Sequence, residues 1–223
     1  MKRAILFLGA ALLAAAPATA PRGDNAAIGG SEGFEKHYIP PPPGSYRLPV
    51  IQRLRDHPLL DAGGRPTTFF DLKEKRLAIV AFIYTACTDA AGCPLSQATL
   101  LSLDRAIAAD PELRTKTTLV TVSFDRERDT PDRLFRLRQS YAPRSDWSFV
   151  TSPDDAALGG MLDDFGQPVA KLRLEDGAWS GLYRHVLKVF LVDRENGVRN
   201  VYSTGFLDRD LVLSDLRTLA GSG

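Results

Sequence analysis

A continuous apolar run from Leu77 to Tyr84 leads into a turn with both cysteines of the chain, and a helical pattern starts at Pro94. An uninterrupted apolar run is typical of a strand that is buried on both faces of a sheet. Strand, turn and helix in succession predict an α/β protein. Two thiols at such a turn can bind a soft metal, exchange as a disulfide or staple a loop.

The alternation continues along the chain. Apolar and β-branched runs predict strands over 77–84, 117–124, 147–151, 185–192 and 198–203, and periodic patterns predict helices over 94–109, 129–141, 153–165 and 208–219. A short hairpin is expected over 59–66, and Asn196-Gly197 is typical of the turn between the last two strands. This order predicts a thioredoxin-like fold: a mixed central sheet with helices on both faces and an N-terminal hairpin extension.

The N-terminus has the features of an export signal. Lys2 and Arg3 precede an apolar run over 4–16, and Ala18-Thr19-Ala20 has the A-x-A pattern of a cleavage site. The run is shorter than the roughly 20 residues of a spanning helix. We therefore expect residues 1–20 to be a signal peptide and the protein to be exported to the periplasm, with membrane attachment only if the signal is retained.

Composition separates a tether from the folded domain and limits the partners. Residues 21–45 are rich in Pro and Gly and end in a run of prolines, which predicts an extended tether before a domain over 46–223. The net charge of +1 shows no basic excess and gives no reason to expect a nucleic-acid partner. In an oxidising compartment, two cysteines form a disulfide or a site that a thiol reductant keeps reduced.

The cysteines and one histidine form a candidate metal site. Cys93 precedes Pro94 at the expected helix start, where unsatisfied N–H groups favour a thiolate, and Gly92 lets the loop fold back toward Cys87. Thiolates select Cu(I), and imidazole suits copper and zinc. His185 is expected to open a strand. Residue chemistry alone leaves two other interpretations open, a structural disulfide and a histidine at a strand edge.

Four blocks of the sequence, in this order, resemble the Sco/SenC family over roughly residues 46–220. They are Tyr84-Thr85-x-Cys87 with Cys93-Pro94, then Val122 to Pro131, then His185, then Tyr202 to Leu207. The resemblance implies a thioredoxin-like fold and a copper ion, Cu(I) or Cu(II), bound by Cys87, Cys93 and His185, with a Cys87–Cys93 disulfide in the oxidised state. It also implies a copper-receiving partner, expected to be a cytochrome c oxidase subunit.

One departure concerns the cysteine spacing. Five residues separate the thiols, Thr88 to Gly92, which is more than is usual in the family. The longer loop makes thiol–disulfide redox chemistry an alternative to copper binding. Asp89 within this loop is a candidate for a weak additional metal ligand. Ordinary disulfide reductases share a C-x-x-C pair and a proline before a late strand. This chain has a wider cysteine spacing, and its residues 181–186 contain no proline, which favours a metal site over general dithiol exchange.

The leading hypothesis is an exported metallochaperone without turnover chemistry that delivers copper to a respiratory oxidase. The alternative is an exported thiol–disulfide oxidoreductase that acts on a partner's cysteines through Cys87 and Cys93. The remaining histidines are interpreted as a solvated tether residue, His37, and a possible auxiliary ligand, His57. The charged run from Asp125 to Asp129 is expected to cap the following helix and to hold the loop by ion pairs.

Overall fold

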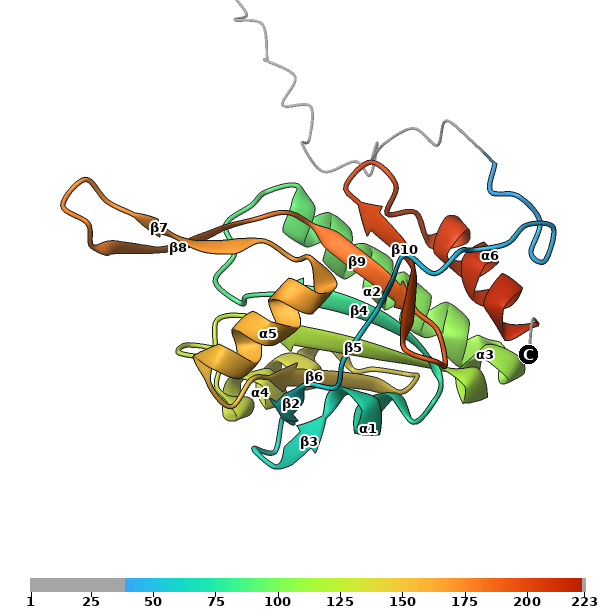
Figure 1. Cartoon of the computed structure of the whole chain (residues 1–223), viewed down its shortest axis with the longest axis horizontal. Coiled ribbons are helices and arrows are strands. Elements are labelled where there is room, and N and C mark those ends of the chain that lie inside the picture. The colour runs from blue at the N-terminus through green and yellow to red at the C-terminus, as the bar shows by residue number, and fades with distance from the viewer. Residues whose placement is uncertain (1–38, 222–223) are drawn as a thin grey trace, which may run out of the picture. The chain divides into compact units, whose positions relative to one another are not determined.

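An eight-stranded mixed sheet forms the centre of the structure, a computed structural model that describes residues 39–221. Its strands lie in the order β1-β10-β9-β4-β5-β6-β2-β3 (Figure 1). The central strands β4, β5 and β6 pair in parallel, whereas β9 and β10 run antiparallel beside β4. Their bounds are β1 Gln52–Arg53, β2 Pro58–Leu60, β3 Pro66–Thr68, β4 Leu77–Ile83, β5 Thr117–Ser123, β6 Trp147–Thr151, β9 Lys188–Val192 and β10 Gly197–Ser203.

Helices cover both faces of this sheet. Side chains of α2 (Gly92–Ala109), α3 (Pro111–Lys116), α4 (Pro131–Tyr141) and α6 (Arg209–Ala220) share one core cluster. Those of α1 (Phe69–Lys73) and α5 (Asp155–Phe165) belong to the other. Strand β4 contributes Leu77, Ile79 and Ala81 to the first core and its alternate residues to the second, because successive side chains of a strand point to opposite faces. This explains its uninterrupted apolar run.

The predicted fold class is confirmed. The order of strands and helices is that of a thioredoxin-like fold. The N-terminal hairpin β2–β3 extends the sheet beyond β6, with β3 at the edge. The predicted turn between β9 and β10 is present, with Asn196 at φ 67° immediately before Gly197. Gly197 has no positive φ and is already the first residue of β10, so this is not the two-residue turn that an Asn-Gly pair favours. Asp110 ends α2 and also caps α3, since its side chain accepts the N–H groups of Glu112 and Leu113. Helix α3 was not among the predicted elements.

A second, two-stranded sheet is the main difference from the sequence-based prediction. Strands β7 (Val169–Arg173) and β8 (Trp179–His185) form an antiparallel hairpin that extends away from the main sheet (Figure 1). The prediction that His185 opens a strand is wrong: it ends β8, and β9 begins at Lys188. The chain changes partners between these residues, because β8 pairs with β7 while β9 pairs with β4 and β10. The Asp176-Gly177 pair was a turn signal for this hairpin.

The N-terminal predictions lie mostly outside the described residues. The predicted signal peptide and residues 21–38 of the predicted tether are not described, and the domain boundary at residue 46 stays a prediction. The last tether residues contact α6: the Ser214 hydroxyl donates to the Pro41 carbonyl at 2.6 Å, and the Gly44 N–H donates to Thr218 Oγ1 at 2.9 Å. Within residues 39–221, no helix has the length and apolar character needed to cross a bilayer.

Candidate metal centre

The structure brings together the three residues that the sequence singled out. Cys87 lies in the loop after β4, and Cys93 lies in the first turn of α2. The two form a disulfide with a Cα–Cα distance of 6.8 Å. Both sulfur atoms and a ring nitrogen of His185 lie within 4.8 Å of one another, and all three residues are half-buried. The five intervening residues therefore do not keep the two sulfur atoms apart.

The loop between the cysteines is shaped by Asp89. Its Oδ1 accepts the N–H groups of Ala91 at 2.9 Å and Gly92 at 3.1 Å at the start of α2. These two hydrogen bonds hold the pKa of Asp89 below its usual value. A Cβ on Gly92 would lie 2.5 Å from Asp89 Oδ2, so a larger residue there would displace this carboxylate. Asp89 is not among the three groups whose ligand atoms cluster, and its carboxylate is used to shape the loop.

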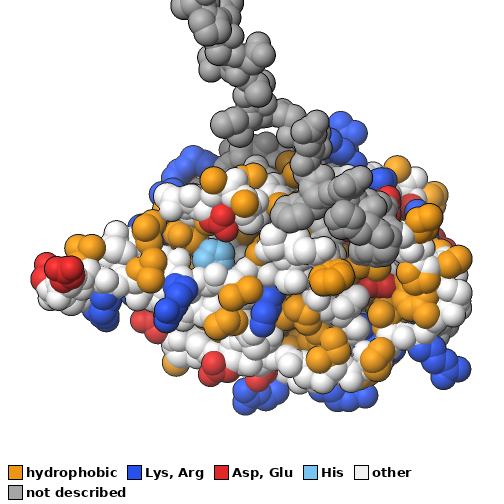
Figure 2. Space-filling model, turned by 90° about the horizontal axis from the view of Figure 1, so that it is seen from above, with side chains coloured by type: hydrophobic (Ala, Val, Ile, Leu, Met, Phe, Trp, Pro, Cys, Tyr) orange, Lys and Arg blue, Asp and Glu red, His pale blue; other side chains and the backbone are white. Residues whose placement is uncertain are grey.

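The imidazole of His185 packs against two aromatic rings of the main body. Its centroid lies 5.6 Å from that of Tyr84, edge-on, and 5.3 Å from that of Phe124. Burial lowers the pKa of His185, although the Asp89 carboxylate and the Val186 backbone act in the opposite direction. The neutral imidazole, which is the form that binds metals, is therefore favoured at neutral pH. Figure 2 shows a histidine at the surface, next to acidic and basic side chains.

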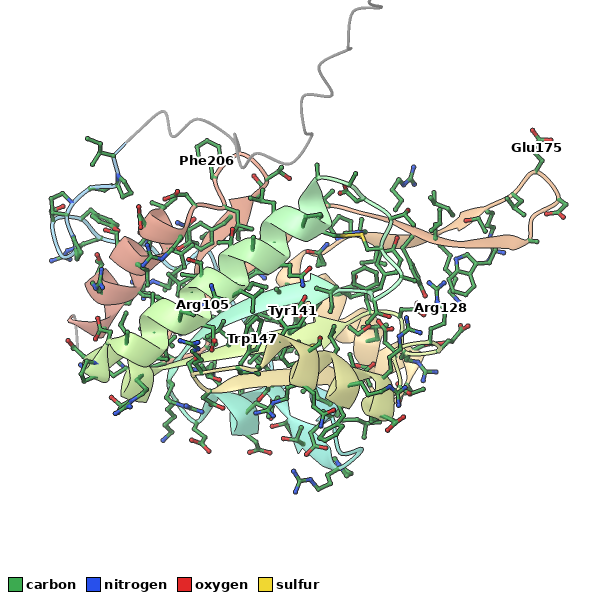
Figure 3. All side chains as sticks on the ribbon, turned by 180° about the vertical axis from the view of Figure 1, so that it is seen from behind. Arg105, Arg128, Tyr141, Trp147, Glu175 and Phe206 are labelled. Carbon is green, nitrogen blue, oxygen red and sulfur yellow. A yellow bond between two sulfur atoms is a disulfide. The ribbon has the colours of Figure 1, made fainter. Side chains whose placement is uncertain are left out.

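A cavity of about 210 Å³ opens beside this cluster. Its wall includes Cys87, Cys93 and His185, together with apolar side chains such as Leu137, Tyr141 and Leu187. The sulfur atoms thus lie at the edge of a mostly apolar hollow that a small ion or an extended side chain can reach. In Figure 3 the disulfide lies near the start of α2.

A buried carboxylate in the loop between β5 and α4 supports the site. Asp129 is fully buried and accepts the Thr85 N–H at 2.9 Å, the Thr85 hydroxyl, and the Ser123 hydroxyl at 2.6 Å. It thereby holds the segment that leads to Cys87 by hydrogen bonds, whereas the ion pair expected within this charged run joins Arg128 to Asp125. The expected helix capping is wrong in detail, since Thr130 caps α4. A hydroxyl residue at the end of each of two neighbouring strands, Thr85 and Ser123, was the available sequence signal.

Of the other two histidines, the structure describes His57. It is buried, and its Nε2 lies 2.8 Å from Asp164 Oδ2, which also pairs with Arg55. His57 is not part of the cysteine and histidine cluster, so the structure gives no support for an auxiliary ligand there. His37 lies outside the described residues.

Comparison with known proteins places these features in a family. The SCO1/SenC family model matches residues 53–221. The copper-bound structure of Bradyrhizobium japonicum ScoI has a TM-score of 0.58 and 22% identity, covering 74% of this chain and 98% of that one. A SCO1/SenC family lipoprotein from Bacillus anthracis str. Ames has a TM-score of 0.65 and 23% identity, covering 79% and 99%.

A third solved structure bears on the cysteines. BsSco is a member of the Sco family of cytochrome c oxidase assembly proteins in which a disulfide switch was identified. Its structure has a TM-score of 0.61 and 19% identity, covering 80% of this chain and 99% of that one. No curated protein matches the chain. At these identities the structures establish the shared fold, whereas the family model spans most of the sequence. The chain belongs to the SCO1/SenC family.

Proposed function

We propose that this protein is an exported copper-binding metallochaperone of Sco type that delivers copper to a respiratory oxidase. The observation that carries the proposal is the cluster of two sulfur atoms and one imidazole nitrogen within 4.8 Å. Thiolate sulfur is selective for Cu(I), and imidazole accepts either oxidation state of copper. Copper-bound B. japonicum ScoI and the oxidase-assembly protein BsSco support the choice of metal and of recipient.

Copper loading first requires reduction of the Cys87–Cys93 disulfide. The S–S bond takes up two electrons and two protons to give two thiols, and a partner dithiol supplies them while forming its own disulfide. The Cys93 thiolate is then favoured by the N-terminus of α2. The burial of His185 keeps its imidazole neutral and able to bind. Copper is the cargo, and it leaves by exchange of these ligands for those of the recipient.

The position of the site suits transfer. Both cysteines and the histidine are only half-buried, so a recipient protein can approach the ion directly. The N-terminal signal pattern and the Pro-rich stretch after it support export and a tether before the folded domain. A lipoprotein within the same family, from B. anthracis, is consistent with a membrane-tethered form.

Copper titration of the reduced protein tests this function. We expect one tightly bound copper per chain, with affinity reduced in Cys87→Ser and in His185→Ala. A wild-type protein that retains no copper after reduction would refute the proposal.

One observation favours a second function, thiol–disulfide exchange with a partner protein. The disulfide is formed, and its sulfur atoms lie at the edge of an open cavity. This function predicts a reduction potential well above that of structural disulfides, which lie below about −300 mV. Exchange activity would then be lost in both Cys→Ser variants and retained in His185→Ala, which separates it from copper transfer.

A further inference from the structure

The three candidate ligands belong to two parts of the protein whose sheets are not paired with each other. Cys87 and Cys93 belong to the main body, whereas His185 ends β8. Within residues 39–221, β8 pairs with β7 and with no strand of the eight-stranded sheet. Pairing of β8 itself therefore does not place His185 beside the cysteines, although β9, which begins three residues later at Lys188, pairs with β4. At the base of the hairpin, the Gln167 side chain donates to the Val186 carbonyl at 2.9 Å.

Arg128 occupies the contact between the hairpin and the body. Its guanidinium carbon lies 4.6 Å from the ring centroid of Trp179 and 5.9 Å from that of Tyr183, both on β8. It also lies 6.0 Å from the ring of Tyr84 on the body. Gly181 passes over the guanidinium: an added Cβ there would lie 3.7 Å from Arg128 Nη1. Figure 3 shows Arg128 below the β7–β8 hairpin, which ends at Glu175.

The guanidinium is itself held by a buried acid. Asp125 is fully buried, and its Oδ2 accepts the Nε–H of Arg128. Its Oδ1 accepts the Tyr183 hydroxyl at 3.2 Å, so the same carboxylate binds the arginine and the strand that the arginine contacts. The backbone N–H of Asp125 donates to Ser123 Oγ at 3.1 Å, and Ser123 Oγ donates to Asp129. Arg128 is thus connected to the group that holds the cysteine loop.

The loop between β5 and α4 therefore binds both the cysteine segment and the histidine strand, in each case two residues before a candidate ligand. Asp129 binds Thr85, which precedes Cys87 by two residues. Asp125 binds Tyr183, which precedes His185 by two residues. We propose that Arg128, fixed by Asp125, is the positioning residue that docks strand β8 on the body and places His185 beside the two cysteines. The consequence for copper rests on the proposed function, whereas the docking itself does not.

A neighbouring arginine shows what a merely structural ion pair looks like in this loop. The side chain of Arg126 is 30% exposed, the same fraction as that of Arg128, and it pairs with Asp155. Within residues 39–221, the Arg126 guanidinium makes no cation–π contact with an aromatic ring of the hairpin. Arg128 Nη2, in contrast, is buried and has no hydrogen-bond partner among residues 39–221. Withdrawing part of a guanidinium from water is costly, and the aromatic faces of the hairpin compensate for it.

The first experiment needs no metal. The ring protons of His185 are recorded by NMR in the oxidised full-length protein and in Arg128→Ala, Arg128→Lys, Tyr183→Phe and the matched control Arg126→Ala. Because the imidazole packs on Tyr84 and Phe124, its ring-current shifts report docking. We expect these shifts to move toward those of a free histidine in Arg128→Ala, less so in Arg128→Lys and Tyr183→Phe, and not at all in Arg126→Ala. Unchanged shifts in a folded Arg128→Ala protein would overturn the proposal.

The second experiment measures Cu(I) affinity of the reduced variants by competition with a chelator. We expect Arg128→Ala to weaken binding by about tenfold or more, the usual effect of losing a group that orients a ligand. Arg128→Ala combined with His185→Ala should be no weaker than His185→Ala alone, because both remove the same ligand. Additive losses would overturn the proposal. Absence of copper from the wild-type protein would instead refute the proposed function, and the metal-free shifts would still decide whether Arg128 docks the hairpin.

Discussion

Replacing Asp129 tests whether the cysteine loop is held by one buried carboxylate. Asp129 accepts a backbone N–H and a hydroxyl from Thr85 and a hydroxyl from Ser123, and its side chain is fully buried. Asp129→Ala leaves three donors without this acceptor, the buried Ser123 hydroxyl and two groups of the half-buried Thr85. An unsatisfied buried donor costs about 1–3 kcal/mol, although the two hydroxyls can rotate toward other acceptors. We therefore expect Asp129→Ala to lower the free energy of unfolding by about 3–5 kcal/mol.

Asp129→Asn should cost less, and the geometry says why. The asparagine oxygen can take the place of Oδ2 and still accept from Thr85 N–H and Ser123 Oγ. Its NH₂ group then faces the Thr85 hydroxyl, which can turn and accept. Hydrogen bonds to a neutral acceptor are about half as strong as those to a carboxylate, so we expect a loss of about 2 kcal/mol. Urea denaturation of the oxidised proteins measures both values.

A second buried acid supplies the matched control. Asp104 on α2 is 2% exposed and accepts the N–H groups of Arg144 and Ser145 and the Ser145 hydroxyl. Asp104→Ala should destabilise the fold comparably without touching the loop that carries Cys87. Copper affinity of the reduced protein should fall about 10–100-fold in Asp129→Ala and stay near wild type in Asp104→Ala. A loss below about 1 kcal/mol in Asp129→Ala, or equal copper affinities of the two variants, would refute the reasoning.

Three further predictions concern pH and redox state. Hydrogen bonds from Arg55 are the main cause that lowers the pKa of Asp164 from 3.8 to about 2. The ionised carboxylate therefore stabilises the fold by at most about 2.5 kcal/mol, and this contribution is present above pH ~4 and lost as the pH falls toward 2. Asp164→Asn should flatten this part of a curve of unfolding free energy against pH. Protonation of the two thiols lowers copper affinity over a wide pH range, but because burial lowers the pKa of His185 below 6.5, the part of the fall that depends on His185 should begin only below that pH. The difference between wild type and His185→Ala isolates this part, and a midpoint of the difference above 6.5 would contradict the prediction. Reducing the Cys87–Cys93 disulfide, which has a sequence separation of 6, should lower the free energy of unfolding by about 2 kcal/mol, and a calorimetric comparison with Cys87→Ser, expected to match the reduced protein, checks the value.

The elements that were predicted correctly share a physical reason. Strand β4 is buried on both faces, so its sequence had to be apolar throughout. Helix α4 begins with Thr130 as cap and Pro131 in its first turn, which are local signals that need no knowledge of the rest of the chain. Local chemistry of this kind made the fold class and the position of both cysteines predictable.

The hairpin that carries His185 was missed because its stability is not local. Strands β7 and β8 are half-buried or exposed along most of their length, so they show neither an apolar run nor a clean alternation. They are held by side chains from elsewhere, such as Arg128 beneath Trp179. The run from His185 into β9 therefore looked like one strand, although the chain changes sheets between them.

The sequence by itself determined which groups were available for chemistry: two thiols after a buried strand, one of them at a helix start, and a histidine far downstream. Only the tertiary structure decided that these groups meet, and how. Hydrogen bonds that Asp129 accepts place the cysteine loop, and Asp125 with Arg128 places the histidine strand. The contacts of Asp129 with Thr85 and of Asp125 with Tyr183 join residues that are distant in the chain. They depend on the three-dimensional packing of a loop whose sequence shows only a run of charges.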